Sequence, residues 1–153
     1  MSLIYFLFLC LLSQAASLSF LSPPPKPPAK VLSETVLDEI FEVRYYEQDF
    51  QLNSKNFTHI KPMTFMGLND LRTLNLTRNF FTRFDLNTFY GLINLEVLDL
   101  SFNQISYMDN QTLTGLISLE YLYLRGNRIK YLASAAWFAN PSLSELTELD
   151  LSN

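Results

Sequence analysis

Cysteine is nearly absent from this chain of 153 residues, and the only one, Cys10, lies in an apolar run from Leu3 to Leu12. A run of this length is too short to span a bilayer but fits the hydrophobic part of a secretory signal. Small residues follow at Ser13, Ala15, Ala16 and Ser17, so we predict that residues 1–17 are a cleaved signal peptide. No lysine or arginine precedes the run, and an uncleaved N-terminal anchor is the alternative. The mature chain then has no cysteine and forms no internal disulfide.

Histidine and glycine are also scarce, with one histidine, His59, and four glycines. The glycines form no phosphate-binding loop or serine elbow, and the acidic residues lack the spacing of a calcium loop. Without a mature cysteine there are no thiol ligands for a metal. We therefore predict no catalytic residue, no cofactor and no metal site, and an enzyme is the least favoured class of protein.

Positive charge is in the minority, since 11 lysines and arginines face 15 acidic residues, for a net charge of −4. Nucleic-acid binding needs clustered basic residues, so no nucleic-acid partner is predicted. The segment from Val31 to Asp49 contains six acidic residues and a single basic residue, Arg44. This segment is interpreted as a solvated acidic face, with contact to a basic partner as the alternative.

Leucine recurs at a fixed spacing. Leu71, Leu95 and Leu119 begin three equally spaced segments, each with the skeleton L-x-x-L-x-L-x-x-N-x-[IF]. A degenerate segment begins at Glu47, and another begins at Leu146. Leucines at every second position predict a strand with one buried face. The asparagine amide carries donors and an acceptor, so it can satisfy backbone groups in an inward turn; these asparagines are Asn79, Asn103 and Asn127.

This skeleton closely resembles the leucine-rich repeat family, and the aromatic residue followed by Gly-Leu resembles the extracellular type, whose repeats are about 24 residues long. The resemblance implies an α/β solenoid over residues 47–153, with about four repeats and a truncated fifth. It implies a curved array with a parallel β-sheet on the concave side and a mostly irregular convex side. The fourth repeat is longer, with an insertion at Ala139 to Pro141. Two further columns are expected on the convex side: Phe65, Phe89, Leu113 and Trp137, and the glycines Gly67, Gly91 and Gly115.

Two segments are predicted between the signal peptide and the array. Residues 18–30 are a proline-rich linker that favours extended polyproline II. Residues 31–46 are an N-terminal capping segment, either a helix from Ser33 to Glu42 or a strand from Phe41 to Tyr46. The helix would place Val36, Leu37, Ile40 and Phe41 on one face.

No polar capping repeat follows Leu151 in the sequence, so we expect a fragment of a longer protein. The resemblance implies cysteine-based caps in extracellular members, which this chain cannot form. Self-association through the uncapped C-terminal edge is expected.

Partner binding is predicted on the variable positions of the strands, which project from the concave face. Aromatic residues beside arginine are enriched in protein interfaces, although large side chains on a twisted sheet also cover one another. The predicted partner-binding residues are Arg72, Arg78, Glu96, Asp99, Phe102, Tyr121, Tyr123 and Arg125.

Three N-glycosylation sequons begin at Asn56, Asn75 and Asn110, and they support a secretory route. We therefore predict a module that recognises a protein ligand or co-receptor, from a receptor, adhesion or matrix protein. It would be secreted or lie on the extracellular side of the plasma membrane, and any membrane attachment would lie in a part of the protein outside this sequence. An intracellular leucine-rich-repeat scaffold is the alternative.

Overall fold

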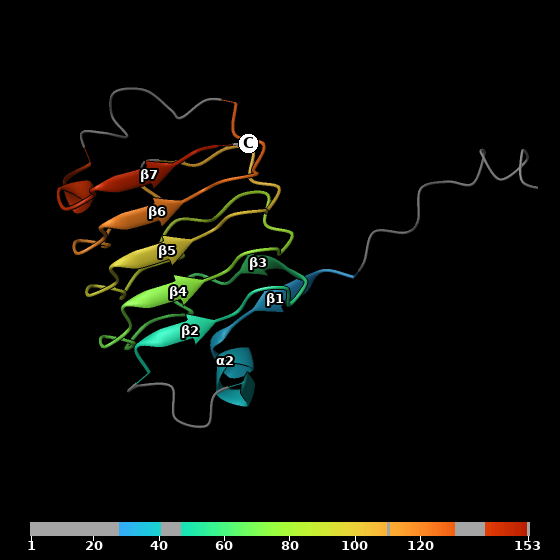
Figure 1. The fold of residues 1–153 in the computed structure, drawn as a ribbon. Helices are drawn as coiled ribbons and strands as arrows, with labels where there is room; N and C mark the ends of the chain where they lie inside the picture. Colours follow the sequence, from blue (N-terminus) through green and yellow to red (C-terminus); the bar gives the residue numbers. More distant parts are fainter. Residues whose placement is uncertain (1–27, 41–46, 110, 131–139, 153) are drawn as a thin grey trace, which may run out of the picture.

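The computed structural model describes residues 28–40, 47–109, 111–130 and 140–152, and its main feature is a stack of parallel strands (Figure 1). The predicted signal peptide, Asn110, Trp137 and most of the proline-rich linker lie outside these residues. The five strands are hydrogen-bonded in the order of the sequence: β2 (Asp49–Gln51), β4 (Thr73–Asn75), β5 (Val97–Asp99), β6 (Tyr121–Tyr123) and β7 (Glu148–Asp150).

The strand register confirms the predicted solenoid and its period. Leu74 lies opposite Leu98, and Leu98 lies opposite Leu122, so these strands repeat at the spacing of the leucine pattern. Leu122 lies opposite Leu149, a wider spacing that agrees with a longer fourth repeat. A 3-10 helix, η3 (Pro141–Leu143), occupies part of this longer repeat.

The core lies behind the sheet and is made of the repeated apolar positions. Leu74, Leu98 and Leu122 are fully buried at the strand centres, with half-exposed neighbours on either side. Phe65, Phe89 and Leu113, the described members of the predicted convex-side column, are also buried, and the rings of Phe65 and Phe89 stack with their centroids 6.2 Å apart. The glycines of the convex side have the positive φ angles expected of them: Gly67 (85°), Gly91 (99°) and Gly115 (95°).

The asparagine ladder closes the turn after each strand. Asn79 Nδ2 donates to the carbonyl oxygens of Leu52 and Leu76 at 2.9 Å, and its Oδ1 accepts from the amide of Phe57 at 3.0 Å. Asn103 and Asn127 make the equivalent bonds one and two repeats later. Each asparagine therefore satisfies buried backbone groups of two successive repeats at once.

A small second sheet and one helix precede the first repeat. Strand β1 (Lys30–Leu32) pairs in parallel with β3 (Phe57–Ile60), and helix α2 (Glu34–Ile40) follows it at the β2 end of the stack (Figure 1). Leu32 and Leu37 are fully buried against the first repeat.

Two details of this N-terminal segment differ from the prediction. Lys30 belongs to β1 and not to the proline-rich linker, because backbone pairing with Phe57 fixes it in an extended strand. Ile40 does not join the buried face of the helix and is 38% exposed. The helix is short, so Leu37 is its one fully buried residue, and Val36 packs partly buried against the core. Residues 41–46, where a strand was the alternative, lie outside the described residues.

The β7 layer is less buried than the layers before it. Leu146 and Leu149 are half-buried and Leu151 is 40% exposed, whereas Leu95, which corresponds to Leu146, is fully buried.

Within the described ranges, none of the helices combines the length and the apolar character that crossing a membrane requires.

Candidate functional site

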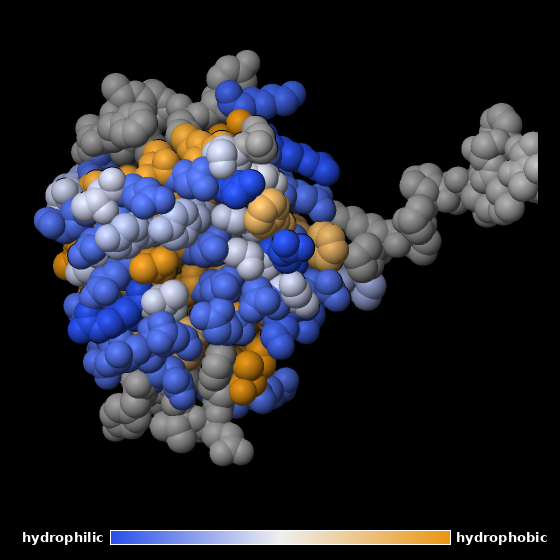
Figure 2. Space-filling model, in the orientation of Figure 1, coloured by the Kyte–Doolittle hydropathy of each residue, from blue (hydrophilic) through white to orange (hydrophobic). Residues whose placement is uncertain are grey.

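The outward face of the five-stranded sheet carries the predicted site residues. This face is mostly hydrophilic over the strands, and its hydrophobic areas are small and separated (Figure 2). The outward positions in and beside the strands carry three arginines, Arg72, Arg78 and Arg125, and six acids, Asp49, Glu96, Asp99, Glu120, Glu148 and Asp150.

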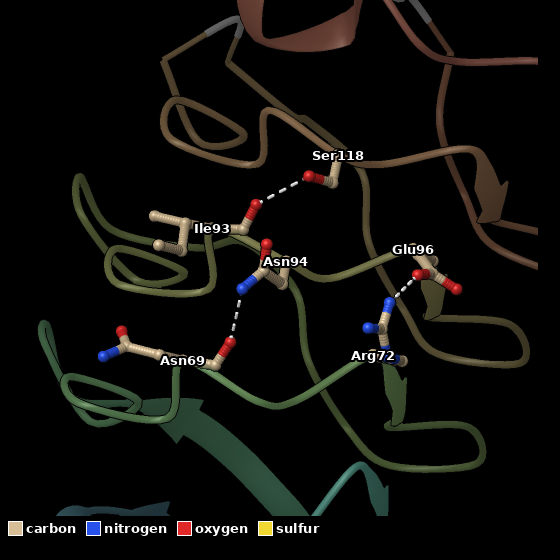
Figure 3. Close-up of polar contacts among 6 residues, drawn as sticks. All are labelled: Asn69, Arg72, Ile93, Asn94, Glu96 and Ser118. Atoms are coloured by element: carbon tan, nitrogen blue, oxygen red, sulfur yellow. Dashed lines mark hydrogen bonds and ion pairs between the residues drawn. The ribbon is translucent and has the colours of Figure 1, made fainter.

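One of these arginines, Arg72, already has an acidic partner. Arg72 and Glu96, which directly precede β4 and β5, form an ion pair between neighbouring repeats (Figure 3). Further contacts join the loops beside this pair. Asn94 Nδ2 donates to the carbonyl oxygen of Asn69 at 2.8 Å, and Ser118 Oγ donates to that of Ile93 at 2.9 Å (Figure 3). Side-chain contacts therefore tie successive repeats together at the start of the strands.

The other two arginines lie at the opposite end of the strands and flank one aromatic ring. The guanidinium carbon of Arg78 lies 5.2 Å from the centroid of the Phe102 ring, and that of Arg125 lies 5.8 Å from it. Both distances fall within the range of cation–π interactions. Phe102 is 45% exposed, although it is large and apolar.

The position of the Phe102 ring follows from the backbone of two successive turns. Arg78 and Phe102 occupy the same place in their repeats and have φ angles of 54° and 56°, in the left-handed region. The next repeat has Gly126 there, with φ of 65°. A Cβ atom on Gly126 would lie 2.7 Å from Phe102 Cδ1, so the missing side chain leaves the space that the ring occupies.

These groups line a shallow hollow of about 350 Å³ at the C-terminal ends of the strands. Five of the eight predicted partner-binding residues line this hollow: Arg78, Asp99, Phe102, Tyr123 and Arg125. Arg72 and Glu96 form their separate pair, and Tyr121 does not line the hollow. Asp150 lines it as well, since β7 places this residue beside Tyr123.

The acidic residues of the hollow also cap turns. Asp99 Oδ1 accepts from the amide of Ser101 at 2.9 Å, and Asp150 Oδ1 accepts from the amide of Ser152 at 2.8 Å. Hydrogen bonds from the side chain and the backbone of Ser152 lower the pKa of Asp150, and the nearby charge of Arg125 lowers it further. The carboxyl group of Asp150 is therefore ionised at neutral pH.

Tyr123 remains a neutral phenol between these charges. Desolvation raises its pKa above the ordinary value of 10.0, and the negative charge of Glu148 raises it further. A neutral tyrosine keeps its hydroxyl as both a donor and an acceptor.

Two of the three sequons lie in the described residues. Asn75 is on β4 in the outward face, where its Nδ2 donates to Gln51 Oε1 at 2.9 Å and its Oδ1 accepts from the amide of Thr77. Asn56 is exposed in the turn before β3, with φ of 63°. Asn110 lies outside the described residues. A glycan on Asn75 would lie on the outward face, and one on Asn56 would leave that face open.

Groups suited to catalysis or metal binding are sparse in the described part of the chain. His59 is exposed on β3, and its Nδ1 lies 3.0 Å from Thr58 Oγ1. The described residues contain no cluster of three histidine, cysteine or acidic side chains that could hold a metal ion.

Short parallel strands stacked around an asparagine ladder define a solenoid repeat protein. A family model described as leucine rich repeat matches residues 48–105 and, in a second overlapping match, residues 71–129. The chain therefore belongs to the leucine-rich repeat family. Members of this family are typically binding scaffolds for other proteins and not catalysts. No curated protein sequence matches the chain.

Proposed function

We propose that this chain is an extracellular recognition module of a receptor, adhesion or matrix protein, and that it binds a partner protein on the outward face of the β2–β7 sheet. The observation that carries this proposal is the hollow at Phe102, where an exposed aromatic ring lies between two arginines. Tryptophan, tyrosine and arginine dominate the binding energy of protein interfaces, and phenylalanine is enriched in them.

Rigidity of the sheet favours binding. The ladder residues Asn79, Asn103 and Asn127 are buried and hydrogen-bonded, and the strand centres are fully buried. A surface that is ordered before it meets a partner avoids much of the entropic cost of ordering on binding.

The extracellular assignment is supported by the apolar N-terminal run and by the three sequons. The equal spacing of β4, β5 and β6 also resembles that of the extracellular repeat type. Attachment to a membrane would come from a part of the protein outside this sequence, and the partner would be a protein ligand or co-receptor.

The proposal is tested by screening the tagged chain against a library of extracellular domains and then mapping the contact. Val97 is half-exposed at the outward face of β5, and His59 is exposed on β3, which belongs to the separate two-stranded sheet. We expect Val97→Arg to abolish binding of a captured partner and His59→Arg to leave it unchanged. A partner that His59→Arg releases and Val97→Arg does not would show that another face binds.

A further inference from the structure

We propose that the hollow at Phe102 binds an acidic segment of a protein partner, with one or two carboxylates on Arg78 and Arg125 and an apolar side chain on the Phe102 ring. This inference rests on the proposed function and names the chemistry of the partner at that site.

The first argument is the state of the three arginines. Arg72 is paired with Glu96, whereas neither Arg78 nor Arg125 has a carboxylate within 4.0 Å in the part of the chain that the structure describes. Both lie instead near the Phe102 ring and are exposed. A guanidinium that stacks on a ring keeps the N–H donors along its edge, and these match the geometry of a carboxylate.

The second argument is that both arginines start from fixed backbone positions. Arg78 is held in a left-handed turn beside Asn79, whose buried amide bonds two successive repeats. Arg125 is tied to the neighbouring repeat, because the amide of Phe102 donates to its carbonyl oxygen at 2.7 Å. The ring between them is held in the space left by Gly126. The backbone of both arginines and the position of the ring are therefore set before a ligand arrives.

The third argument is the pattern of charge on the outward face, which disfavours an extended anionic ligand. The six acids of the outward face would repel a long polyanion such as a sulfated polysaccharide. Asp99 and Asp150 each use one carboxylate oxygen to accept a backbone hydrogen bond in their own turn. A short acidic segment can reach Arg78 and Arg125 without crossing the rest of the acidic face.

The test uses the whole chain, labelled with ¹⁵N, and three probes. The first is a peptide with the central sequence Glu-Leu-Glu, the second is the same peptide with Gln-Leu-Gln, and the third is a heparin oligosaccharide. Binding is followed by the shifts of the arginine side-chain Nε–H signals. We expect the acidic peptide to bind about tenfold tighter than the amide peptide and to shift Arg78 and Arg125, because charge-assisted pairs are roughly twice as strong as neutral ones. Salt at about 1 M, where the Debye length is about 3 Å, should remove most of this difference.

Matched variants locate the effect. Arg78→Asn and Arg125→Ala should each weaken binding of the acidic peptide about tenfold, which corresponds to the loss of about 1.4 kcal/mol. Asparagine is chosen at position 78 because it tolerates the left-handed backbone. Arg128→Ala is the control, since Arg128 is exposed and does not line the hollow. Thermal unfolding of each variant establishes that it is folded.

Three outcomes overturn the inference: equal affinity for the acidic and amide peptides, an equal loss in Arg128→Ala, or tighter binding of the heparin oligosaccharide than of the acidic peptide. Binding of the captured partner to the variants tests this inference and the proposed function separately. If Val97→Arg abolishes binding of the partner but the double variant Arg78→Asn/Arg125→Ala does not, the inference of an acidic segment is wrong. Recognition on the outward face is then still supported. If none of the three substitutions weakens binding of the partner, both the inference and the proposed function are wrong.

Discussion

Asn103 joins two successive repeats, because its Nδ2 donates a hydrogen bond to the carbonyl oxygen of Leu76, in the preceding repeat, at 3.1 Å. The same nitrogen donates to the carbonyl oxygen of Leu100 at 2.9 Å, and Oδ1 accepts from the amide of Phe81 at 3.2 Å. One buried side chain thus satisfies backbone groups on both sides of the boundary between repeats.

We expect Asn103→Ala to destabilise the fold by about 1–3 kcal/mol, because it leaves buried backbone groups without partners. Urea unfolding followed by circular dichroism measures the change. The control is Asn69→Ala, since the Asn69 side chain is exposed and points away from its neighbours in Figure 3. Equal losses of stability in the two variants would contradict the role of the ladder.

Gly126→Ala should destabilise the fold and displace the Phe102 ring. A left-handed residue with a Cβ costs roughly 1–2 kcal/mol, and here that Cβ also meets Phe102 Cδ1 at 2.7 Å. Removing the ring by Phe102→Ala should relieve the second effect and leave the first. Unfolding free energies of the two single variants and the double variant form a cycle. Strict additivity in that cycle would mean that the ring does not depend on Gly126.

Ser152→Ala should raise the pKa of Asp150 toward its ordinary value of 3.8, because the hydrogen bond from the Ser152 side chain is the largest cause of the lowered pKa. A carboxyl group whose pKa is lowered by folding adds stability above its unfolded pKa, and this stability is lost as the pH falls through the folded pKa. Stability of the variant should therefore depend less on pH in that acidic range. An NMR titration of the Asp150 carboxyl carbon measures the pKa, and Ser106→Ala, at an exposed serine, should leave it unchanged.

Expression of the chain with a C-terminal tag in a eukaryotic cell should release a protein that begins near Leu18, because residues 1–17 are the predicted signal peptide. N-terminal sequencing of the secreted protein checks the cleavage. Peptide mapping should find sugar on Asn56, which is exposed, and on Asn110. An intact Met1 on an unglycosylated protein in the cytosol would favour the intracellular scaffold instead.

Self-association through the β7 edge should respond to Leu151. Strand β7 is an edge of the five-stranded sheet, and Leu151 beside it is 40% exposed. Open edges next to apolar side chains favour pairing between chains. We expect Leu151→Lys to lower the apparent mass of residues 18–153 in light scattering. Leu86→Lys is the control, because Leu86 is 56% exposed and lies in a loop between β4 and β5. A wild-type fragment that is already monomeric would contradict this prediction.

The array was predictable because three successive repeats present the same pattern to the same neighbours. Leu74 and Leu76 alternate as strand residues, and Asn79 follows at the ladder position, so three repeats supply three copies of one signal. The helix before the first repeat was predicted as one of two alternatives. The strand at Lys30 was not predicted, because so short a strand carries too little pattern and its partner at Phe57 lies far along the chain.

The site was predictable only as a set of outward positions. Repeat numbering places Arg72, Arg78 and Arg125 on one face, but it does not say which arginine meets a carboxylate and which meets a ring. That division depends on side-chain conformations and on the turn at Phe102. Gly126 was missed, although a signal existed, since it replaces the large residues found at positions 78 and 102.

The N-terminal end of the array is covered by a segment that non-covalent contacts hold in place. Backbone pairing of β1 with β3 and burial of Leu32 and Leu37 hold this segment in place, and the only cysteine of the chain lies in the predicted signal peptide. The mature domain should therefore have the same melting temperature with and without dithiothreitol. It should also fold in the reducing cytoplasm of bacteria, where production needs no oxidative refolding and yields the unglycosylated protein directly.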